Sequence, residues 1–181
     1  KLVVKRSIPF IFSSSCTVYG QADEMPINEE MKLKKPFSPY GNTKQTGEQI
    51  IVDCCNAYKG FNAILLRYFN PIGAHSSAKI GEFTQGIPQN LIPFLTQTVI
   101  GKRKVLKVFG SNHDTPDGTC IRDYIHVQDL ALAHVRALDY LIAKEGKYIF
   151  NIGTGNGLSV LDIVNTFEQV NNLKVNYLIG P

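Results

Sequence analysis

The sequence lacks the features that mark several large classes of protein. Its four cysteines, at positions 16, 54, 55 and 120, form no C-x-x-C pair, and none of the four histidines has a zinc-like spacing to them. No apolar run approaches the ~20 residues that a membrane-spanning helix needs. The 19 lysines and arginines are spread against 15 acids, which leaves a net charge of +4 and no basic stripe. We therefore expect no metal site, no membrane span and no nucleic-acid partner.

Two further absences concern the location of the protein. No charged segment followed by an apolar stretch and a cleavage site opens the chain, as a secretory signal would. With no disulfide pattern, the cysteines are expected to be free thiols in a reducing compartment, which predicts a cytoplasmic protein. The 181 residues, of which 44% are apolar, suit one domain or part of one with a packed core.

Apolar residues alternate between the spacing of strands and that of helices along the chain. Residues 20–37 show no clear period and predict a loop, and Gly60 is expected to end the helix before it. The alternation predicts an α/β protein with a mostly parallel sheet, helices on its faces, and ligands beyond the carboxyl ends of the strands. The predicted strands are 8–12, 62–69, 105–109, 147–152 and 174–178, and the predicted helices are 39–58, 90–100, 127–143 and 159–170.

Tyr40 and Lys44 stand four residues apart at the start of a predicted helix. Ser38 suits the N-cap of this helix, and Pro39 suits its first position. Residues i and i+4 share a helix face, so the ammonium is expected beside the phenol, where it would lower the tyrosine pKa from about 10. The pair is a candidate proton-transfer device, although so short a pattern also occurs by chance on helix surfaces.

Three segments that carry polar or aromatic side chains are predicted to meet at one sheet edge. Ser15 follows the first predicted strand, Tyr40 begins the next helix, and residues 68–71 close the second strand. Because carboxyl ends of parallel strands share an edge, these segments are expected to converge on one site.

The motifs in this order resemble the extended short-chain dehydrogenase/reductase family, and within it the UDP-glucose 4-epimerases. The first three are Ser13-Ser14-Ser15-x-Thr17-Val18-Tyr19-Gly20, the Tyr40 and Lys44 pair, and Arg67-Tyr68-Phe69-Asn70-Pro71-x-Gly73-Ala74-His75; residues 86–93, 109–110, 117–119 and 122–131 carry the finer likeness. The resemblance implies a partial Rossmann-like doubly wound parallel sheet plus part of a smaller substrate-binding domain. Residues 1–75 would be the C-terminal part of the NAD-binding domain, and residues 76–181 would contribute to both domains.

The resemblance also implies a reaction. Such enzymes interconvert UDP-galactose and UDP-glucose by transient NAD-dependent oxidation at sugar C4, rotation of the 4-keto intermediate and return of the hydride. Tyr40 would act as acid and base, and Lys44 would bond the nicotinamide ribose and, together with the cationic nicotinamide ring, lower the tyrosine pKa. Ser15 would share the proton path, its alternative role being a cap at the strand end. The whole protein would be a homodimer.

The family positions that hold cofactor and substrate can be carried over residue by residue. For four of them a simpler role stays open: Arg122 could pair with Asp123 or Asp129, Phe109 could belong to the core, and Tyr68 with Phe69 could be a buried aromatic pair. The implied cofactor residues are Tyr40, Lys44, Tyr68 and Phe69. The implied substrate residues are Ser15, Cys16, Thr17, Tyr68, Phe69, Asn70, Gln89, Asn90, Leu91, Lys107, Val108, Phe109 and Arg122.

The glycine-rich loop that holds the NAD pyrophosphate in this family is not recognisable here. Residues 153–157 alternate glycine with polar residues, but the spacing differs from G-x-G-x-x-G, so they predict a turn. No G-x-x-G-x-x-G sequence precedes Ser15, and the chain opens as if inside a helix. The expectation is therefore a fragment that keeps the catalytic pair but, by itself, holds no NAD and is inactive.

Two other functions stay open. One is another sugar-nucleotide epimerase or a dehydratase of the same family, although dehydratases usually carry Thr-Asp-Glu where this chain has Ser14-Ser15-Cys16. The other is a non-catalytic truncated domain that keeps only the fold.

Overall fold

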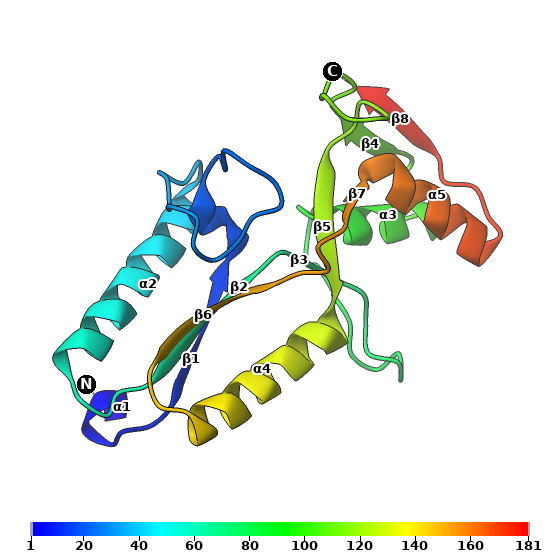
Figure 1. Ribbon diagram of the computed structural model, residues 1–181. Coiled ribbons are helices and arrows are strands. Elements are labelled where there is room, and N and C mark those ends of the chain that lie inside the picture. Colours follow the sequence, from blue (N-terminus) through cyan, green and yellow to red (C-terminus); the bar gives the residue numbers. More distant parts are fainter. Residues whose placement is uncertain (1, 181) are drawn as a thin grey trace.

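A three-stranded parallel sheet with one helix on each face forms the first half of the architecture (Figure 1). The computed structural model describes residues 2–180. The sheet has the order β1-β2-β6, and α2 and α4 lie on its opposite sides. The elements are β1 (Phe10–Ser15), β2 (Ala63–Tyr68), β6 (Lys147–Ile152), α2 (Pro39–Ala57) and α4 (Val127–Ala143).

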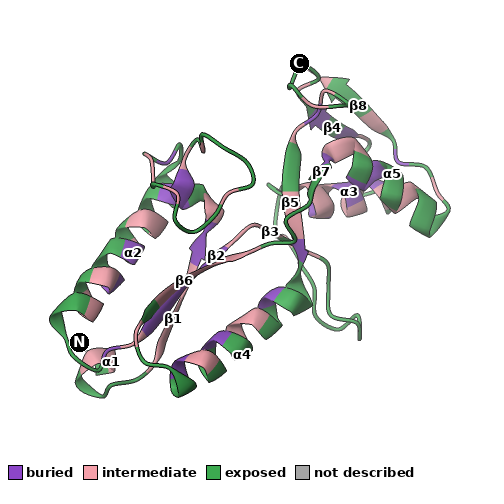
Figure 2. Cartoon of the chain, viewed as in Figure 1, coloured by how far each residue is buried: buried purple, intermediate pink, exposed green. Residues whose placement is uncertain are grey.

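The central strand β2 is buried on both faces, which explains its continuous apolar sequence. Ala63 and Leu65 pack with Ile51 of α2. The alternate residues Ile64 and Leu66 pack with α4. Figure 2 shows this burial on β2, whereas the side of α4 that faces away from the sheet is exposed. Each large apolar side chain buried in this way contributes about 1.5–3 kcal/mol, so β2 fixes both helices to the sheet.

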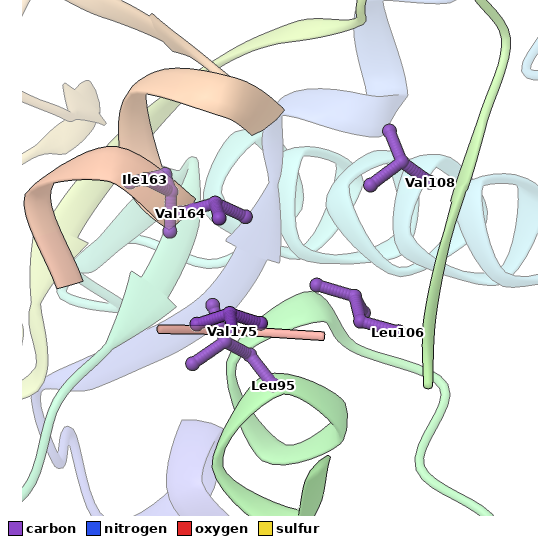
Figure 3. Packing of buried hydrophobic residues seen from close by; sticks show 6 residues of the cluster. All are labelled: Leu95, Leu106, Val108, Ile163, Val164 and Val175. Atoms are coloured by element: carbon purple, nitrogen blue, oxygen red, sulfur yellow. The ribbon is translucent and has the colours of Figure 1, made fainter. Parts of the chain in front are cut away.

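The second half of the architecture packs two helices against a small parallel sheet. Figure 3 shows the cluster that joins them, in which Leu95 of α3 meets Val164 of α5 and Leu106 of β4. A mixed sheet of order β3-β5-β7 lies between the two halves (Figure 1). The elements are β3 (Asn70–Ile72), α3 (Leu91–Val99), β4 (Leu106–Phe109), β5 (Ile121–His126), β7 (Gly157–Ser159), α5 (Val160–Asn171) and β8 (Tyr177–Gly180), with the short α1 (Leu2–Lys5) and the 3₁₀ helix η1 (Cys16–Tyr19) near the chain start.

The predicted α/β class is confirmed, and so are the helix at 127–143, the strand at 147–152 and the irregular segment at 20–37. The capped helix start at Ser159, with Asp162 completing a capping box, is also confirmed. The helical conformation predicted for the first residues is confirmed at Leu2–Lys5; Lys1 and Pro181 lie outside the described residues.

Several predicted strand boundaries are wrong. The first strand begins at Phe10 and includes the three serines, and the last strand is Tyr177–Gly180 instead of 174–178. The strands form three sheets, and β5 was not predicted. Its sequence, Ile-Arg-Asp-Tyr-Ile-His, is mostly exposed or half-buried and has no apolar run to mark it as a strand.

A buried charged pair ties α2 to the sheet. Glu48 and Arg67 are each only 3% exposed. Arg67 donates from Nε to Glu48 Oε1 at 2.9 Å and from Nη2 to Oε2 at 2.6 Å, and its Nη1 donates to the Tyr19 hydroxyl at 3.0 Å. Ser14 of β1 donates to the same carboxylate. The pair therefore fixes the rotation of α2, and with it the position of the helix start that carries Tyr40.

Candidate active site

The start of α2 brings Tyr40 to the carboxyl end of β1. Ser38 caps the helix by accepting from the Gly41 amide at 3.1 Å, with Pro39 at the first helical position as predicted. A Cβ on Gly41 would lie 2.8 Å from Pro36 Cβ and 3.3 Å from the Thr17 carbonyl oxygen. Glycine at this position therefore lets the helix start approach the segment that follows β1. Tyr40 itself is half exposed, at 50%.

The Ser15 hydroxyl caps a helix and also lies within hydrogen-bonding reach of Tyr40. Its oxygen accepts from the Thr17 amide at 3.3 Å and from the Thr17 hydroxyl at 3.0 Å, which caps η1. These two contacts occupy the acceptor sites of Ser15 and leave its hydrogen free to donate. Hydrogen bonding to Ser15 lowers the pKa of Tyr40, as donation to a phenolate would. The capping role and the place beside the tyrosine thus coexist in one side chain.

The predicted lowering of the Tyr40 pKa by Lys44 is wrong for this chain. Desolvation by burial raises the pKa of Tyr40 above 10, and the nearby Tyr68 and Cys16 raise it further, against the opposing effect of Ser15. The Lys44 ammonium lies 5.5 Å from the centre of the Tyr40 ring. The ammonium bonds to the backbone carbonyl of Ser13, and its charge does not outweigh the desolvation of the phenol. The phenol is therefore protonated at neutral pH.

A substitution at Tyr68 tests this account of the Tyr40 pKa. Tyr68→Phe removes a titratable neighbour that raises the pKa, so Tyr40 should titrate at lower pH than in the unchanged chain. Ser15→Ala removes the opposing hydroxyl and should raise the Tyr40 pKa further. Both shifts can be followed by NMR titration of ¹³C-labelled tyrosine, with Tyr177 in β8 as an internal reference. A Tyr40 pKa unchanged in both variants would contradict the assignment of these neighbours.

Lys44 is held at the edge of β1. Its Nζ donates to the Ser13 carbonyl oxygen at 2.8 Å and lies 5.3 Å from the centre of the Phe12 ring. The backbone bond and the two aromatic faces restrict an otherwise flexible side chain. Lys44 therefore presents a fixed positive charge beside Tyr40, at the end of the strand where a ligand is expected.

Arg122 and Asp123 of β5 add opposite charges beside Cys16. Burial raises the pKa of the Cys16 thiol, whereas the Ser15 hydroxyl and then the Arg122 charge lower it. Arg122 is exposed and donates only to the carbonyl of its neighbour Ile121, at 2.8 Å. None of the ion pairs among residues 2–180 includes Arg122, so the predicted alternative of a salt bridge to Asp123 or Asp129 is wrong. Its guanidinium is available to an anion.

Residues 153–157 form a loop whose amides bind a carboxylate of the protein itself. Asp123 accepts from the amides of Thr154 and Gly155 at 2.9 Å each, and from the Thr154 hydroxyl at 2.7 Å. A Cβ on Gly153 would collide with this carboxylate and with the Phe69 ring. The predicted turn is confirmed. The loop amides, which could have bound a phosphate, donate instead to the Asp123 carboxylate.

Five of the predicted residues come together at this edge: Ser15, Tyr68 and Cys16 influence the pKa of Tyr40, and Ser15 and Arg122 influence that of Cys16. Thr17 is exposed next to Ser15, and Phe69, half-buried, contacts Gly153 at the base of the loop. Asn70 donates to the Asp123 backbone carbonyl at 3.0 Å, so its amide group joins β3 to β5 at this site.

The other predicted substrate residues lie around α3 and β4. Gln89 is exposed, Asn90 donates to Glu82 at 3.2 Å, and Leu91 packs against the Leu95 cluster. Strand β4 alternates, with Lys107 and Phe109 outward and Val108 buried. Phe109 is 71% exposed, so a core role for it is wrong, whereas the Val108 side chain does belong to the core. In the described part of the chain, none of these residues forms a hydrogen bond to Ser15, Tyr40 or Lys44.

Sequence reasoning missed Ser13, Asp123 and His134 as parts of the site. Ser13 stands in a recognised motif, but only its backbone oxygen reaches Lys44, and backbone contacts leave no trace in side-chain identity. His134 lies ninety residues from Lys44 and nothing in its local pattern marks it. Among residues 2–180, no three histidines, cysteines or acids are placed to hold a metal ion, and no helix is long and apolar enough to span a bilayer.

A parallel α/β sheet with a serine, a tyrosine and a lysine at the end of its first strand is typical of NAD-dependent enzymes that act on hydroxyl groups. Comparisons with known proteins identify the family. The NAD dependent epimerase/dehydratase family matches residues 2–153, and the chain belongs to this family.

Within the family, this chain is similar to UDP-glucose 4-epimerases. That of Pasteurella multocida is 51% identical over 93% of this chain and 50% of its own length, and that of Homo sapiens is 49% identical over 93% and 49%. The crystal structure of the Bifidobacterium longum enzyme in complex with NAD⁺ and UDP is 45% identical, with a TM-score of 0.93 over 99% of this chain and 54% of that one. This chain therefore spans about half the length of these relatives.

Proposed function

We propose that this chain carries the acid–base machinery of a UDP-hexose 4-epimerase, which interconverts UDP-galactose and UDP-glucose. The observation that carries the proposal is the grouping of Ser15, Tyr40 and Lys44 at the carboxyl end of β1. The similarity to UDP-glucose 4-epimerases over 93% of the chain supports it.

The residues present fit the nicotinamide end of NAD. Lys44 offers an ammonium that can donate to ribose hydroxyls, Tyr68 and Phe69 offer half-buried aromatic surface, and Tyr40 is exposed enough to reach both cofactor and sugar. When bound, NAD would supply the hydride acceptor and donor at sugar C4, as well as a positive charge beside the phenol. That charge offers what Lys44 alone does not, a reason for the Tyr40 pKa to fall.

Tyr40 is proposed to take the proton from the sugar 4-hydroxyl and to return it after the intermediate has turned. The Ser15 hydrogen is free to bridge the sugar oxygen and the phenol, because both acceptor sites of Ser15 are occupied by Thr17. Lys44 holds its charge beside the ring through the bond to Ser13. The exposed Arg122 guanidinium is proposed to bind the diphosphate, for which its planar fork is suited.

The epimerase is favoured over the dehydratase by the side chains next to Tyr40. Elimination of water needs an acid and a base at sugar C5 and C6. The nearest groups after β1 are the Ser15 hydroxyl and the Cys16 thiol, whose pKa is raised by burial. The carboxylate of Asp123, which also lies near Cys16, is bonded to the loop amides. For the whole protein we further propose a homodimer, and a cytoplasmic location in keeping with four free cysteines.

A chimaera tests the proposed function in a complete enzyme. The segment of the Pasteurella multocida relative that matches this chain is replaced by residues 1–181, and conversion of UDP-galactose to UDP-glucose is measured by chromatography of the nucleotide sugars. The expected result is epimerisation at a rate comparable with that of the parent, and no 4-keto-6-deoxy product. A folded chimaera that dehydrates its substrate, or that leaves UDP-galactose unchanged, would show the proposal to be wrong.

A further inference from the structure

His134 of α4 contacts the active-site strand from the face of the sheet opposite to α2. Its Nε2 lies 2.9 Å from the Ser13 hydroxyl, and its Nδ1 lies 2.9 Å from the Leu130 carbonyl oxygen. A carbonyl only accepts, so Nδ1 must carry the hydrogen. In the neutral ring Nε2 is then the acceptor, and Ser13 donates to it. The bond within α4 thus fixes the orientation of the imidazole that receives Ser13.

Ser13 makes contacts on two sides of β1, because the side chain of a strand residue points out of the sheet while its carbonyl lies in the plane of the sheet. Its hydroxyl reaches α4, whereas the hydroxyl of the next residue, Ser14, reaches Glu48 of α2. The Phe10 amide donates to the Asn62 carbonyl, and backbone groups of alternate strand residues point the same way, so the even-numbered residues of β1 bond toward β2. The Ser13 carbonyl therefore points away from β2. There it accepts from Lys44. Ser13 therefore connects His134 directly to Lys44.

A second contact leads from His134 toward Tyr40. The imidazole lies against the Tyr68 ring, with centres 6.2 Å apart and planes tilted by 51°. Tyr68 in turn raises the pKa of Tyr40. His134 thus contacts two residues, Ser13 and Tyr68, each of which acts on a member of the proposed catalytic pair.

We infer that His134 is a positioning residue for Lys44 and Tyr40, which acts through Ser13 and touches neither substrate nor cofactor. The inference rests on the proposed function of the Tyr40 and Lys44 pair. Without the imidazole, the half-buried Ser13 hydroxyl loses its partner, and the end of β1 is free to shift. The Ser13 carbonyl would then hold the Lys44 ammonium less well. His134 is thereby the contact by which α4 takes part in the site.

Chemical labelling of Lys44 in the full chain tests the inference without any need for activity. Brief treatment with acetic anhydride followed by mass spectrometry gives the acetylation rate of each lysine. Lys44 should react more slowly than the exposed Lys59. In His134→Ala and in Ser13→Ala, Lys44 should react about fivefold faster, the ratio that corresponds to one hydrogen bond of typical strength. The double variant should show no further increase, because both changes break the same connection.

Two variants separate positioning from general loosening of the fold. His134→Gln keeps a donor and an acceptor and should restore most of the protection of Lys44, whereas Val135→Ala, exposed on the same helix, should leave it unchanged. Ser13→Ala removes only the hydroxyl and keeps the carbonyl that Lys44 contacts. If His134→Ala fails to fold, the Lys44 reactivity of Ser13→Ala tests the inference. Unchanged Lys44 reactivity in a folded His134→Ala or Ser13→Ala chain would overturn the inference.

The chimaera adds a kinetic readout. His134→Ala should lower kcat and leave the KM for UDP-galactose nearly unchanged, since the substrate is not contacted. An inactive chimaera would count against the proposed function alone, and the labelling result would still decide the role of His134.

Discussion

Arg67→Met should lower the free energy of unfolding by about 3–5 kcal/mol, because it leaves the Glu48 carboxylate buried without its partner. The two side chains are each 3% exposed and share two hydrogen bonds, and Arg67 also bonds the Tyr19 hydroxyl. A loss of this size is comparable with the whole stability of many domains. Urea denaturation followed by circular dichroism measures it.

The matched control is Arg136→Met. Arg136 pairs with Asp139 at 3.6 Å, but both side chains are more than half exposed, so the change should stay within about 0.5 kcal/mol. The double variant Arg67→Met with Glu48→Leu removes both charges and should recover most of the loss, since an apolar pair of similar volume replaces a buried ion pair. If Arg67→Met cost no more than Arg136→Met, the pair would not anchor α2.

The sequence predicted the elements with a clear apolar period and missed those held by polar contacts. The helix at 127–143 and the strand at 147–152 carry their own pattern and appear with the predicted bounds. Strand β5 has little buried surface of its own, and it is defined by its pairing with β3 and β7. Such pairing depends on segments 54 and 34–38 residues away, which no local window contains.

The candidate site was predictable where spacing or motif marks it. Ser38 and Pro39 fix the start of α2, so the placement of Tyr40 and Lys44 on its first two turns followed from local rules. The pKa of Tyr40 did not, because it depends on burial and on Tyr68 and Cys16, which come from other segments. His134 was equally out of reach, since its link to Lys44 passes through a backbone carbonyl.

The raised pKa of Tyr40 limits its action as a base. A phenol whose pKa is raised by burial stays protonated at neutral pH, so little phenolate is present to act as a base. The base form would be reached when a cation joins the site, which ties proton removal to the presence of the oxidised cofactor. In the proposed mechanism Lys44 would position the phenol and the charge of NAD would lower its pKa, whereas the spacing argument had assigned both roles to the lysine.

The account makes its strongest functional prediction at Tyr40. In the chimaera, Tyr40→Phe should lower kcat by about 10²–10⁴-fold, the usual contribution of a positioned acid–base group, and should spare UDP-hexose binding. The matched control is Tyr58→Phe, since Tyr58 is exposed beyond the other end of α2 and should be replaceable without effect.

The rate of UDP-galactose conversion by the chimaera with Tyr40→Phe, compared with the unchanged chimaera, is the most direct test of the central claim. The account predicts a loss of at least about 100-fold in kcat, with UDP-hexose affinity retained by calorimetry. Turnover equal to that of the unchanged chimaera would contradict it, because the proton would then pass through some other group.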